Sequence, residues 1–337
     1  MTVTAAGTRA RSGPVPAGPR RPPPIARHGA AMAGIAALGA VAYYLLTTLK
    51  GDQGQVCLLV VIWTVSVTGL NIVQGLAGYP SLAQAAFYGG GAYLSTIFLH
   101  DGLPIVLAAL LAVLAVTAAG LVVGLVFART RGQYFAIGTL FFGAVMALVF
   151  NNAIRYTGGP NGRPVDLGFS PETTLRLLAA SMSIGFALFY VLSRVRFGAR
   201  LRSIREDEDL ADHLGVPTAR TKLLALVLSS VFGAWAGVLL AQYDGVIAPS
   251  QFTFGQSFLM FVAVGLGGYG RLLAPLAGSL VVIGLPQLLN VGPGISQIVV
   301  GVIFILVTLV VPGGILGGLD SVYRRLRDAA RLTRGTA

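Results

Sequence analysis

The charged side chains that could do chemistry are concentrated in one polar segment, residues 193–222. Its middle, residues 199–214, is predicted to form one helix, because apolar residues recur there at helical spacing: Leu201, Ile204, Ala211 and Leu214. The charges on its other faces are Arg200, Arg202, Arg205, Glu206, Asp207, Asp209 and Asp212. Gly215 and then Pro217 predict that the helix ends in a left-handed cap. Such a helix cannot enter a bilayer, so it either meets the membrane surface or a partner, or is a solvated connection between two spans.

Residue patterns typical of catalysis or metal binding are not found in the sequence. The three histidines, His28, His100 and His213, are scattered over the tail and loops. The single cysteine, Cys57, lies in an apolar run, where a small core residue is expected. Neither lysine follows a glycine, so there is no Walker A motif. The sequence therefore predicts no catalytic residue, no metal site and no cofactor, and it gives an enzyme little support.

The composition indicates a protein that crosses a membrane many times. Hydrophobic residues make up 55% of the 337 residues and charged residues 11%, with a mean hydropathy of +0.78. A soluble domain carries about 25% charged residues. The net charge of +12 could suggest a nucleic-acid partner. However, the basic residues lie in tails and loops between apolar runs, as the positive-inside rule requires, so no nucleic acid is expected.

We predict an all-α, polytopic transmembrane helical bundle with about ten membrane segments, or eight if one doubtful pair is re-entrant. A spanning helix needs about 20 residues. The segment at 257–268 is short for a span, and the segment at 80–99 is interrupted by Ser81, Gln84 and three consecutive glycines. The predicted segments are 30–49, 56–76, 80–99, 103–128, 134–150, 173–192, 223–243, 257–268, 272–289 and 296–311.

Lysine and arginine alternate between the loops in a way that orients the bundle. Residues 193–222 hold seven of them and 129–133 hold two, whereas 100–102 and 244–256 hold none. We therefore expect both termini in the cytoplasm. The expected organisation is a disordered basic tail at 1–29, a membrane domain at 30–318 that includes the 193–222 loop, and a basic cytoplasmic tail at 319–337.

The predicted spans contain polar groups but no acidic residue. Proton-coupled carriers commonly keep a carboxylate or histidine in the membrane. Uncharged polar residues such as Asn71, Gln84 and Tyr93 could line a pathway or bond neighbouring helices. Glycine pairs at four-residue spacing, Gly120 with Gly124 and Gly233 with Gly237, are candidate helix contacts, although chance matches are common in a chain with 45 glycines.

Four stretches together resemble the branched-chain amino acid ABC transporter permeases of the LivM type. SIREDE at 203–208, with Ala211, GV at 215–216 and KLLA at 222–225, is similar to that family's cytoplasmic loop. SLAQAAF with GGAY at 81–93 resembles its SLGQAAF…GAY segment. GGYG at 267–270, with Pro275 and Gly278, resembles GGxG…GPxxGA, and TGGPNG at 157–162 resembles TGGxxG. Alanines at 83 and 274 replace family glycines, which leaves the local packing and the substrate open.

The resemblance implies a permease subunit that passes amino acids across the bacterial inner (plasma) membrane. The charged helix would be the coupling helix that docks on separate ABC ATPase subunits, through Arg202, Arg205, Glu206, Asp207, Ala211 and Gly215. Its apolar stripe would fill a groove on the ATPase while its charges pair at the rim. Candidate residues for the pathway are Asn71, Ser81, Gln84, Phe87 and Tyr93. A second homologous permease and an extracytoplasmic solute-binding protein would complete the system in the bilayer.

Two alternatives stay open at this level. Family members with similar motifs carry different solutes, so urea, amides or another small polar solute are possible cargoes. A secondary carrier that coordinates Na⁺ through backbone carbonyls at broken helices is also conceivable, since glycine-rich stretches occur at 89–91 and 265–270.

Overall fold

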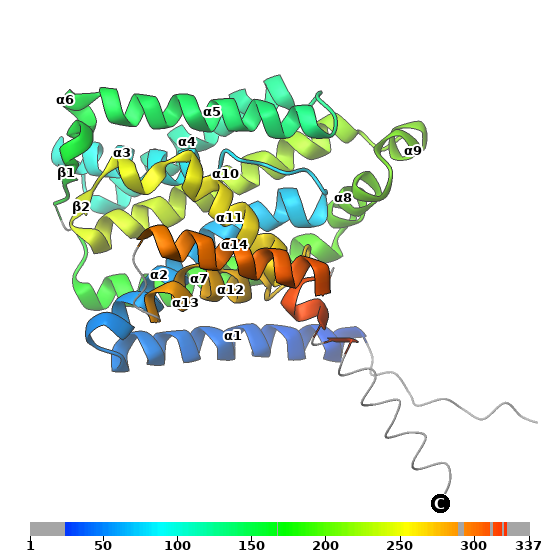
Figure 1. Ribbon diagram of the computed structural model, residues 1–337, viewed down its shortest axis with the longest axis horizontal. Coiled ribbons are helices and arrows are strands. Elements are labelled where there is room, and N and C mark those ends of the chain that lie inside the picture. Colours follow the sequence, from blue (N-terminus) through cyan, green and yellow to red (C-terminus); the bar gives the residue numbers. More distant parts are fainter. Residues whose placement is uncertain (1–23, 167, 289–292, 311–312, 319, 322–337) are drawn as a thin grey trace, which may run out of the picture.

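The computed structural model describes residues 24–166, 168–288, 293–310, 313–318 and 320–321 (Figure 1). It is 83% helical, which confirms the predicted all-α bundle. Within the described residues the only strands are β1 (Arg163–Pro164) and β2 (Val246–Ile247), which pair antiparallel. The helical content follows from the sequence, since long runs without charge must satisfy their backbone groups internally if they are to lie in lipid.

In the part of the chain that the structure describes, six helices are long and apolar enough to cross a membrane. The first two are α1 (Pro24–Thr48) and α2 (Gly51–Leu70), and α2 continues without a break into the π-helix η1 (Asn71–Leu76). The other four are α4 (Ile105–Phe127), α5 (Gln133–Asn152), α7 (Pro171–Arg194) and α10 (Thr218–Asp244). They coincide with six of the predicted segments.

The remaining four predicted segments coincide with shorter or interrupted helices. These are α3 (Gln84–His100), α11 (Phe254–Gly267), the run formed by α12 (Ala274–Ser279), η4 (Leu280–Gly284) and α13 (Leu285–Leu288), and α14 (Pro293–Val310). Short elements fill the connections: α6 (Ile154–Thr157), η2 (Gly159–Asn161), α8 (Arg196–Glu206), α9 (Glu208–His213) and η3 (Pro249–Phe252). The number of complete crossings stays a prediction.

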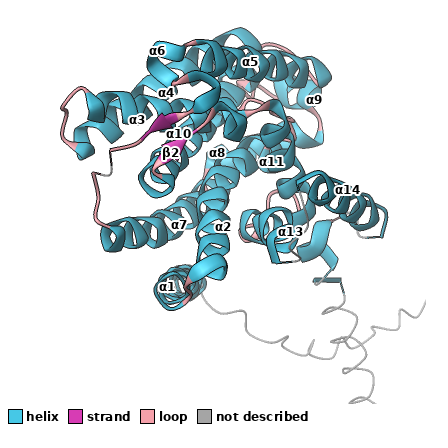
Figure 2. Ribbon diagram, turned by 60° about the vertical axis from the view of Figure 1, so that its left-hand side comes forward, coloured by secondary structure: helices cyan, strands magenta, loops and turns pink. Residues whose placement is uncertain are grey.

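Helix α10 is the centre of the bundle and packs on α2, α3 and α4, while α1 lies at the edge against α7 (Figures 1 and 2). Small residues set the closest approach. A Cβ on Gly237 of α10 would lie 1.9 Å from the carbonyl oxygen of Tyr88 in α3. Gly233 faces Phe87 of α3, and Gly120 of α4 faces Ser230 of α10. The predicted glycine contacts between helices are therefore confirmed.

The two ends of the bundle collect different loops (Figure 1). One end carries α8 and α9, and the loops at 77–83 and 128–132 contact them there. The other end carries α6, β1 and β2, where Val165 N–H bonds the carbonyl of Gly245. Loops that the charge count assigns to the cytoplasm thus share one end, and loops assigned to the outside share the other.

Helices α3 and α11 both begin inside the bundle. The ring of Phe252, just before α11, lies 5.4 Å from the Tyr88 ring and 5.5 Å from the Tyr93 ring, both in α3. In the first turns, the N–H of Ala85 donates to Oγ of Ser257 at 2.9 Å. With 14 residues, α11 rises about 21 Å, against about 30 Å of hydrocarbon. This geometry is that of a half-helix, which agrees with the shortness noted for the 257–268 segment.

The proposed boundaries of the domain and tails are only partly within the described residues. Helix α1 begins at Pro24, so residues 24–29 are helical rather than part of a disordered tail. Residues 1–23 and 322–337, and with them most of both predicted tails, lie outside the described part. The division at 30 and 318 stays a prediction.

Candidate functional site

The charged segment forms two helices, which corrects the single helix predicted for 199–214. Helix α8 ends at Glu206 and α9 begins at Glu208. Asp207 separates them in an extended conformation, with φ −159° and ψ 111°. Its carboxylate accepts a hydrogen bond from the N–H of Leu210 at 2.9 Å, so it caps the N-terminus of α9. The apolar residues keep their helical spacing across Asp207, but Asp207 caps a new helix instead of continuing the first one.

The end of α9 agrees with the prediction made from Gly215. This glycine has φ +84°, and its N–H donates to the carbonyl of Asp212. The N–H of Val216 donates to the carbonyl of Ala211 at 3.0 Å. These two bonds together form a Schellman motif, which satisfies carbonyls that the helix leaves free.

The apolar stripe of this segment points mostly toward the bundle rather than outward. Leu201 is fully buried, and Ile204 and Ala211 are 3% and 2% exposed. Leu214, by contrast, is 76% exposed, and Leu210 beside it is 57% exposed. The expectation that the whole stripe fills a groove on a partner is therefore wrong. Three of its members anchor the segment to its own chain, and the outward apolar surface consists of the fourth, Leu214 at the C-terminal cap of α9, together with Leu210.

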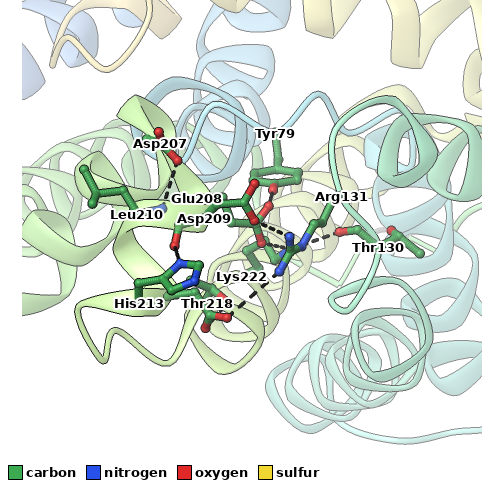
Figure 3. A network of polar contacts seen from close by, with 11 residues as sticks. Tyr79, Thr130, Arg131, Asp207, Glu208, Asp209, Leu210, His213, Thr218 and Lys222 are labelled. Atoms are coloured by element: carbon green, nitrogen blue, oxygen red, sulfur yellow. Dashed lines mark hydrogen bonds and ion pairs between the residues drawn. The ribbon is translucent and has the colours of Figure 1, made fainter.

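A buried ion pair fixes α9 to three other parts of the chain (Figure 3). Nζ of Lys222, in the first turns of α10, lies 2.6 Å from Oε1 of Glu208, with side-chain exposures of 2% and 12%. The same ammonium donates to the carbonyl of Thr130 at 2.9 Å and lies 4.5 Å from the ring centroid of Tyr79. The hydroxyl of Tyr79 donates to the other oxygen of Glu208.

A second, exposed ion pair strengthens the same junction. Arg131, between α4 and α5, pairs with Asp209 and lies 3.9 Å from Asp212 (Figure 3). The chain thus joins α9 to the loops at 77–83 and 128–132 and to α10. The sequence interpretation counted Lys222 as a loop cation and missed this burial. The available signal was its place inside the first turns of a long apolar helix.

The remaining candidates for coupling occupy varied positions. Arg205 turns toward the bundle, where Nη1 donates to the carbonyl of Gly75 at 2.6 Å. Arg202 is exposed and donates to the carbonyl of Ser193 at 2.8 Å, and Glu206 is exposed at the end of α8. Arg205 is exposed as well, but this bond ties its guanidinium to the bundle, and its part in coupling stays a prediction.

Two of the five pathway candidates make structural hydrogen bonds between helices. Gln84 is fully buried; its Nε2 donates to the carbonyl of Ser66 at 2.9 Å, and its Oε1 accepts from Oγ of Ser229 at 2.8 Å. Asn71 accepts from the N–H of Gly270 at 3.0 Å and donates to the carbonyl of Arg271 at 2.9 Å. These amides join α2, α3, α10 and the loop after α11.

The other three candidates lie buried in or near α3. The ring of Phe87 packs against Phe142, and Tyr93 packs against Phe150 and Phe252. Within the described residues, the hydroxyls of Ser81 and Tyr93 have no hydrogen-bond partner. These two buried oxygens thus have unused hydrogen-bonding capacity, whereas the amides of Asn71 and Gln84 are bonded.

An open cleft of about 550 Å³ lies at the end of the bundle away from α9. It is lined by Ser250 of η3, by Thr253 and Phe254 at the start of α11, and by Asn151 of α5. The TGGPNG loop borders it through Pro160. The described residues hold no group of three or more His, Cys, Asp or Glu arranged to bind a metal.

Comparison with known proteins identifies the family. The sequence pattern of the family described as "Branched-chain amino acid transport system / permease component" matches residues 54–308. The high-affinity branched-chain amino acid transport system permease protein LivM of Escherichia coli K12 is 30% identical over 294 residues, covering 78% of this chain and 69% of that protein. The permease protein LivH of the same transport system and organism is 34% identical over 148 residues, covering 43% of this chain and 45% of LivH.

A more distant relative carries a different name. The tyrosine transport system permease protein of Clostridioides difficile is 25% identical over 187 residues, covering 55% of this chain and 62% of that protein. The helices and the relatives together identify a multi-pass membrane protein that serves transport. With the family pattern over 54–308 and the LivM relative covering more than two thirds of both chains, the chain belongs to the family of branched-chain amino acid transport permease components.

Proposed function

We propose that this chain is the membrane subunit of an ABC importer that passes branched-chain or related amino acids across the bacterial inner membrane. The names of the LivM and LivH relatives support this cargo class, and the tyrosine permease shows that related chains serve other amino acids. Separate ATPase subunits would drive the transport, and the chain's own residues would supply the gate.

The observation that carries the proposal is the exposed apolar pair on α9. Leu210 and Leu214 stand on a short helix at the end of the bundle that collects the basic loops. A soluble loop helix with no partner would gain nothing from two outward leucines, whereas a groove on an ATPase would bury them. Arg200, Arg202 and Glu206 on exposed faces nearby would set the orientation of docking.

The buried pair of Lys222 and Glu208 gives such docking a mechanical effect. Because Glu208 belongs to α9, a displacement of α9 acts directly on α10 through Lys222 and on the 77–83 loop through Tyr79. The 128–132 loop follows through Thr130 and Arg131. An ATPase that moves this one helix would therefore move the cytoplasmic ends of several membrane helices together.

We further propose that the solute passes the start of α11. The N-terminus of a half-helix favours a carboxylate, because its free N–H groups and dipole are positive. Asn151, Ser250 and Thr253 add uncharged polar groups in the cleft beside it. Ser81 and Tyr93 would serve deeper in the bundle. A second homologous permease would close the pathway, and an extracytoplasmic solute-binding protein would deliver the amino acid to the α6, β1 and β2 end.

The test is to replace Leu210 and Leu214 by glutamate and to co-purify the permease with its ATPase subunits. We expect loss of the ATPase and of ATP-driven uptake without a loss of thermal stability, since both side chains are exposed. Leu214→Met, which keeps the apolar surface, is the matched control. Retention of the ATPase and of uptake by the glutamate variant would contradict the docking. Gradient-driven uptake by this chain alone in liposomes would replace the proposal with a secondary carrier.

A further inference from the structure

A second cleft, of about 340 Å³, lies at the α9 end of the bundle and is separate from the one at the start of α11. It lies between η1, the loop that follows η1, helix α8 and helix α11 with its following loop. Its lining residues are Gln74, Gly78, Pro80, Arg205, Phe261 and Tyr269. The volume is at the lower end of the range for small-molecule sites.

The charged wall of this cleft is Arg205. Its Nη1 donates to the carbonyl of Gly75. In a continuing π-helix, that carbonyl would accept a hydrogen bond from the N–H of the residue five positions later. That residue is Pro80, which has no N–H, so the arginine supplies the missing donor. The guanidinium also lies 5.7 Å from the ring centroid of Tyr269. Arg205 takes part in none of the ion pairs among the described residues. A guanidinium has five N–H donors, so most donors of Arg205 remain for a ligand.

The second polar group is the amide of Gln74, which is 4% exposed. Its Nε2 donates to the carbonyl of Phe261 at 3.2 Å. Its Oε1 has no hydrogen-bond partner among the described residues. Buried acceptors are normally bonded, so an acceptor left free on a residue that lines a cleft points to a donor that binds there.

We propose that this cleft binds an apolar amino acid from the cytoplasmic side. Its carboxylate pairs with the guanidinium of Arg205, its ammonium donates to Oε1 of Gln74, and its side chain packs on Phe261 and Pro80. A simple anion such as phosphate would use the arginine but would leave the free acceptor and the apolar wall without a partner. The identification of the amino acid with the transported solute rests on the proposed function.

The consequence of such binding is feedback on transport. The ligand joins Arg205 of α8 to Gln74 of η1 and Phe261 of α11, so it favours the arrangement in which these elements lie together. A ligand that favours one state of a cycle slows the steps that leave that state. Solute that accumulates in the cytoplasm would therefore slow its own import.

The direct test is calorimetric titration of the purified permease, without ATPase or binding protein. The probes are L-leucine, L-leucinamide, which lacks the carboxylate, and 4-methylpentanoate, which lacks the amine. We expect L-leucine to bind and each of the other two to bind about tenfold more weakly, since each lacks one charge-assisted hydrogen bond. Equal binding of inorganic phosphate and L-leucine would overturn the assignment to an amino acid.

Variants locate the site. Arg205→Lys keeps the charge but loses the planar fork, and Phe261→Trp fills the cleft, so each should weaken L-leucine binding about tenfold. Arg202→Lys, on the same helix but outside the cleft, is the matched control and should bind as the parent protein does. Leucine binding that survives both Arg205→Lys and Phe261→Trp would place the site elsewhere and overturn the proposal.

The assembled importer separates the two proposals. With L-leucine added on the ATPase side, uptake by the parent complex should fall relative to its own rate without that leucine. The corresponding ratio for Phe261→Trp should stay near one. Normal uptake without inhibition or leucine binding would remove the cytoplasmic site and leave the proposed function intact. Failure of the complete importer to take up any amino acid would remove the proposed function instead.

Discussion

The ammonium of Lys222 lies 2.6 Å from the carboxylate of Glu208, and both side chains are almost completely withdrawn from solvent. Each member compensates a charge that would otherwise be buried alone. The pair also has further partners, because Thr130 accepts from the lysine and Tyr79 donates to the glutamate. Its position makes it a direct connection between α9 and α10.

Removing one member of this pair should destabilise the protein strongly. Glu208→Gln leaves the ammonium buried without its counter-charge, and the expected cost is about 3–5 kcal/mol. The double variant Glu208→Gln with Lys222→Met should recover most of that loss, because no buried charge remains. Thermal unfolding in detergent measures the change.

The control is the exposed pair of Arg176 and Glu172 within α7, whose side chains are 64% and 66% exposed. Arg176→Gln should change stability by less than about 1 kcal/mol, since exposed pairs contribute little. If Glu208→Gln proved as mild as Arg176→Gln, the Lys222–Glu208 pair would not connect α9 to the bundle in the way described.

Gly215→Val should disrupt the end of α9. A β-branched residue at φ +84° is strained by roughly 1–2 kcal/mol or more, and the Schellman bonds would be lost with it. We expect reduced association with the ATPase, measured by co-purification. Gly215→Asn is the matched control, because asparagine tolerates the left-handed conformation. Equal retention of the ATPase by both variants would show that the cap has no part in docking.

Variants of Gln84 and Tyr93 should distinguish polar groups that stabilise the bundle from polar groups that contact a solute. Gln84→Leu removes bonds to Ser66 and Ser229 inside the bundle and should cost about 1–3 kcal/mol of stability. Tyr93→Phe removes a hydroxyl without a partner among the described residues, so stability should change by about 0.5 kcal/mol or less.

Uptake kinetics complete this comparison. A raised KM for Tyr93→Phe at unchanged stability would place the hydroxyl on the pathway. An unchanged KM would remove Tyr93 from the pathway candidates.

Gly237→Ala should separate α10 from α3. The new methyl group would lie 1.9 Å from the carbonyl oxygen of Tyr88, and this contact can be relieved only by moving a backbone. Overpacking of this kind costs about 1–3 kcal/mol. Gly301→Ala in α14 is the control, because a Cβ there meets nothing within 4 Å and alanine favours the helix. A lower melting temperature for Gly301→Ala than for Gly237→Ala would refute the packing argument.

Features set by local chemistry were predictable from the sequence. Apolar runs gave the helical segments, because apolar length alone decides whether a helix can lie in lipid. The cap at Gly215 followed from the conformational freedom of one residue type, and the glycine contact at Gly237 followed from residue size. The alternation of basic residues divided the loops into the same two groups that the two ends of the bundle collect.

Features that depend on contacts between distant segments were not predictable. The break at Asp207 arises from competition between a cap and a continuing helix, and periodicity describes only the helix. The burial of Lys222 needs Glu208, Tyr79 and Thr130, which come from three separate parts of the chain. Leu201 and Ile204 point inward because other parts of the chain pack against them. The spacing of apolar residues along one helix does not say which segment will pack there.

Because α10 is one uninterrupted helix, a displacement of one of its ends should also move the other end. Its 27 residues form one rod of about 40 Å. Near its start Lys222 joins α9, and near its end Gln242 accepts from the N–H groups of Gly168 and Phe169. A continuous helix with contacts near both ends can transmit a displacement of one end to the contacts at the other. If an ATPase does move α9, the displacement should thus reach the segment before α7 through the backbone of α10 itself.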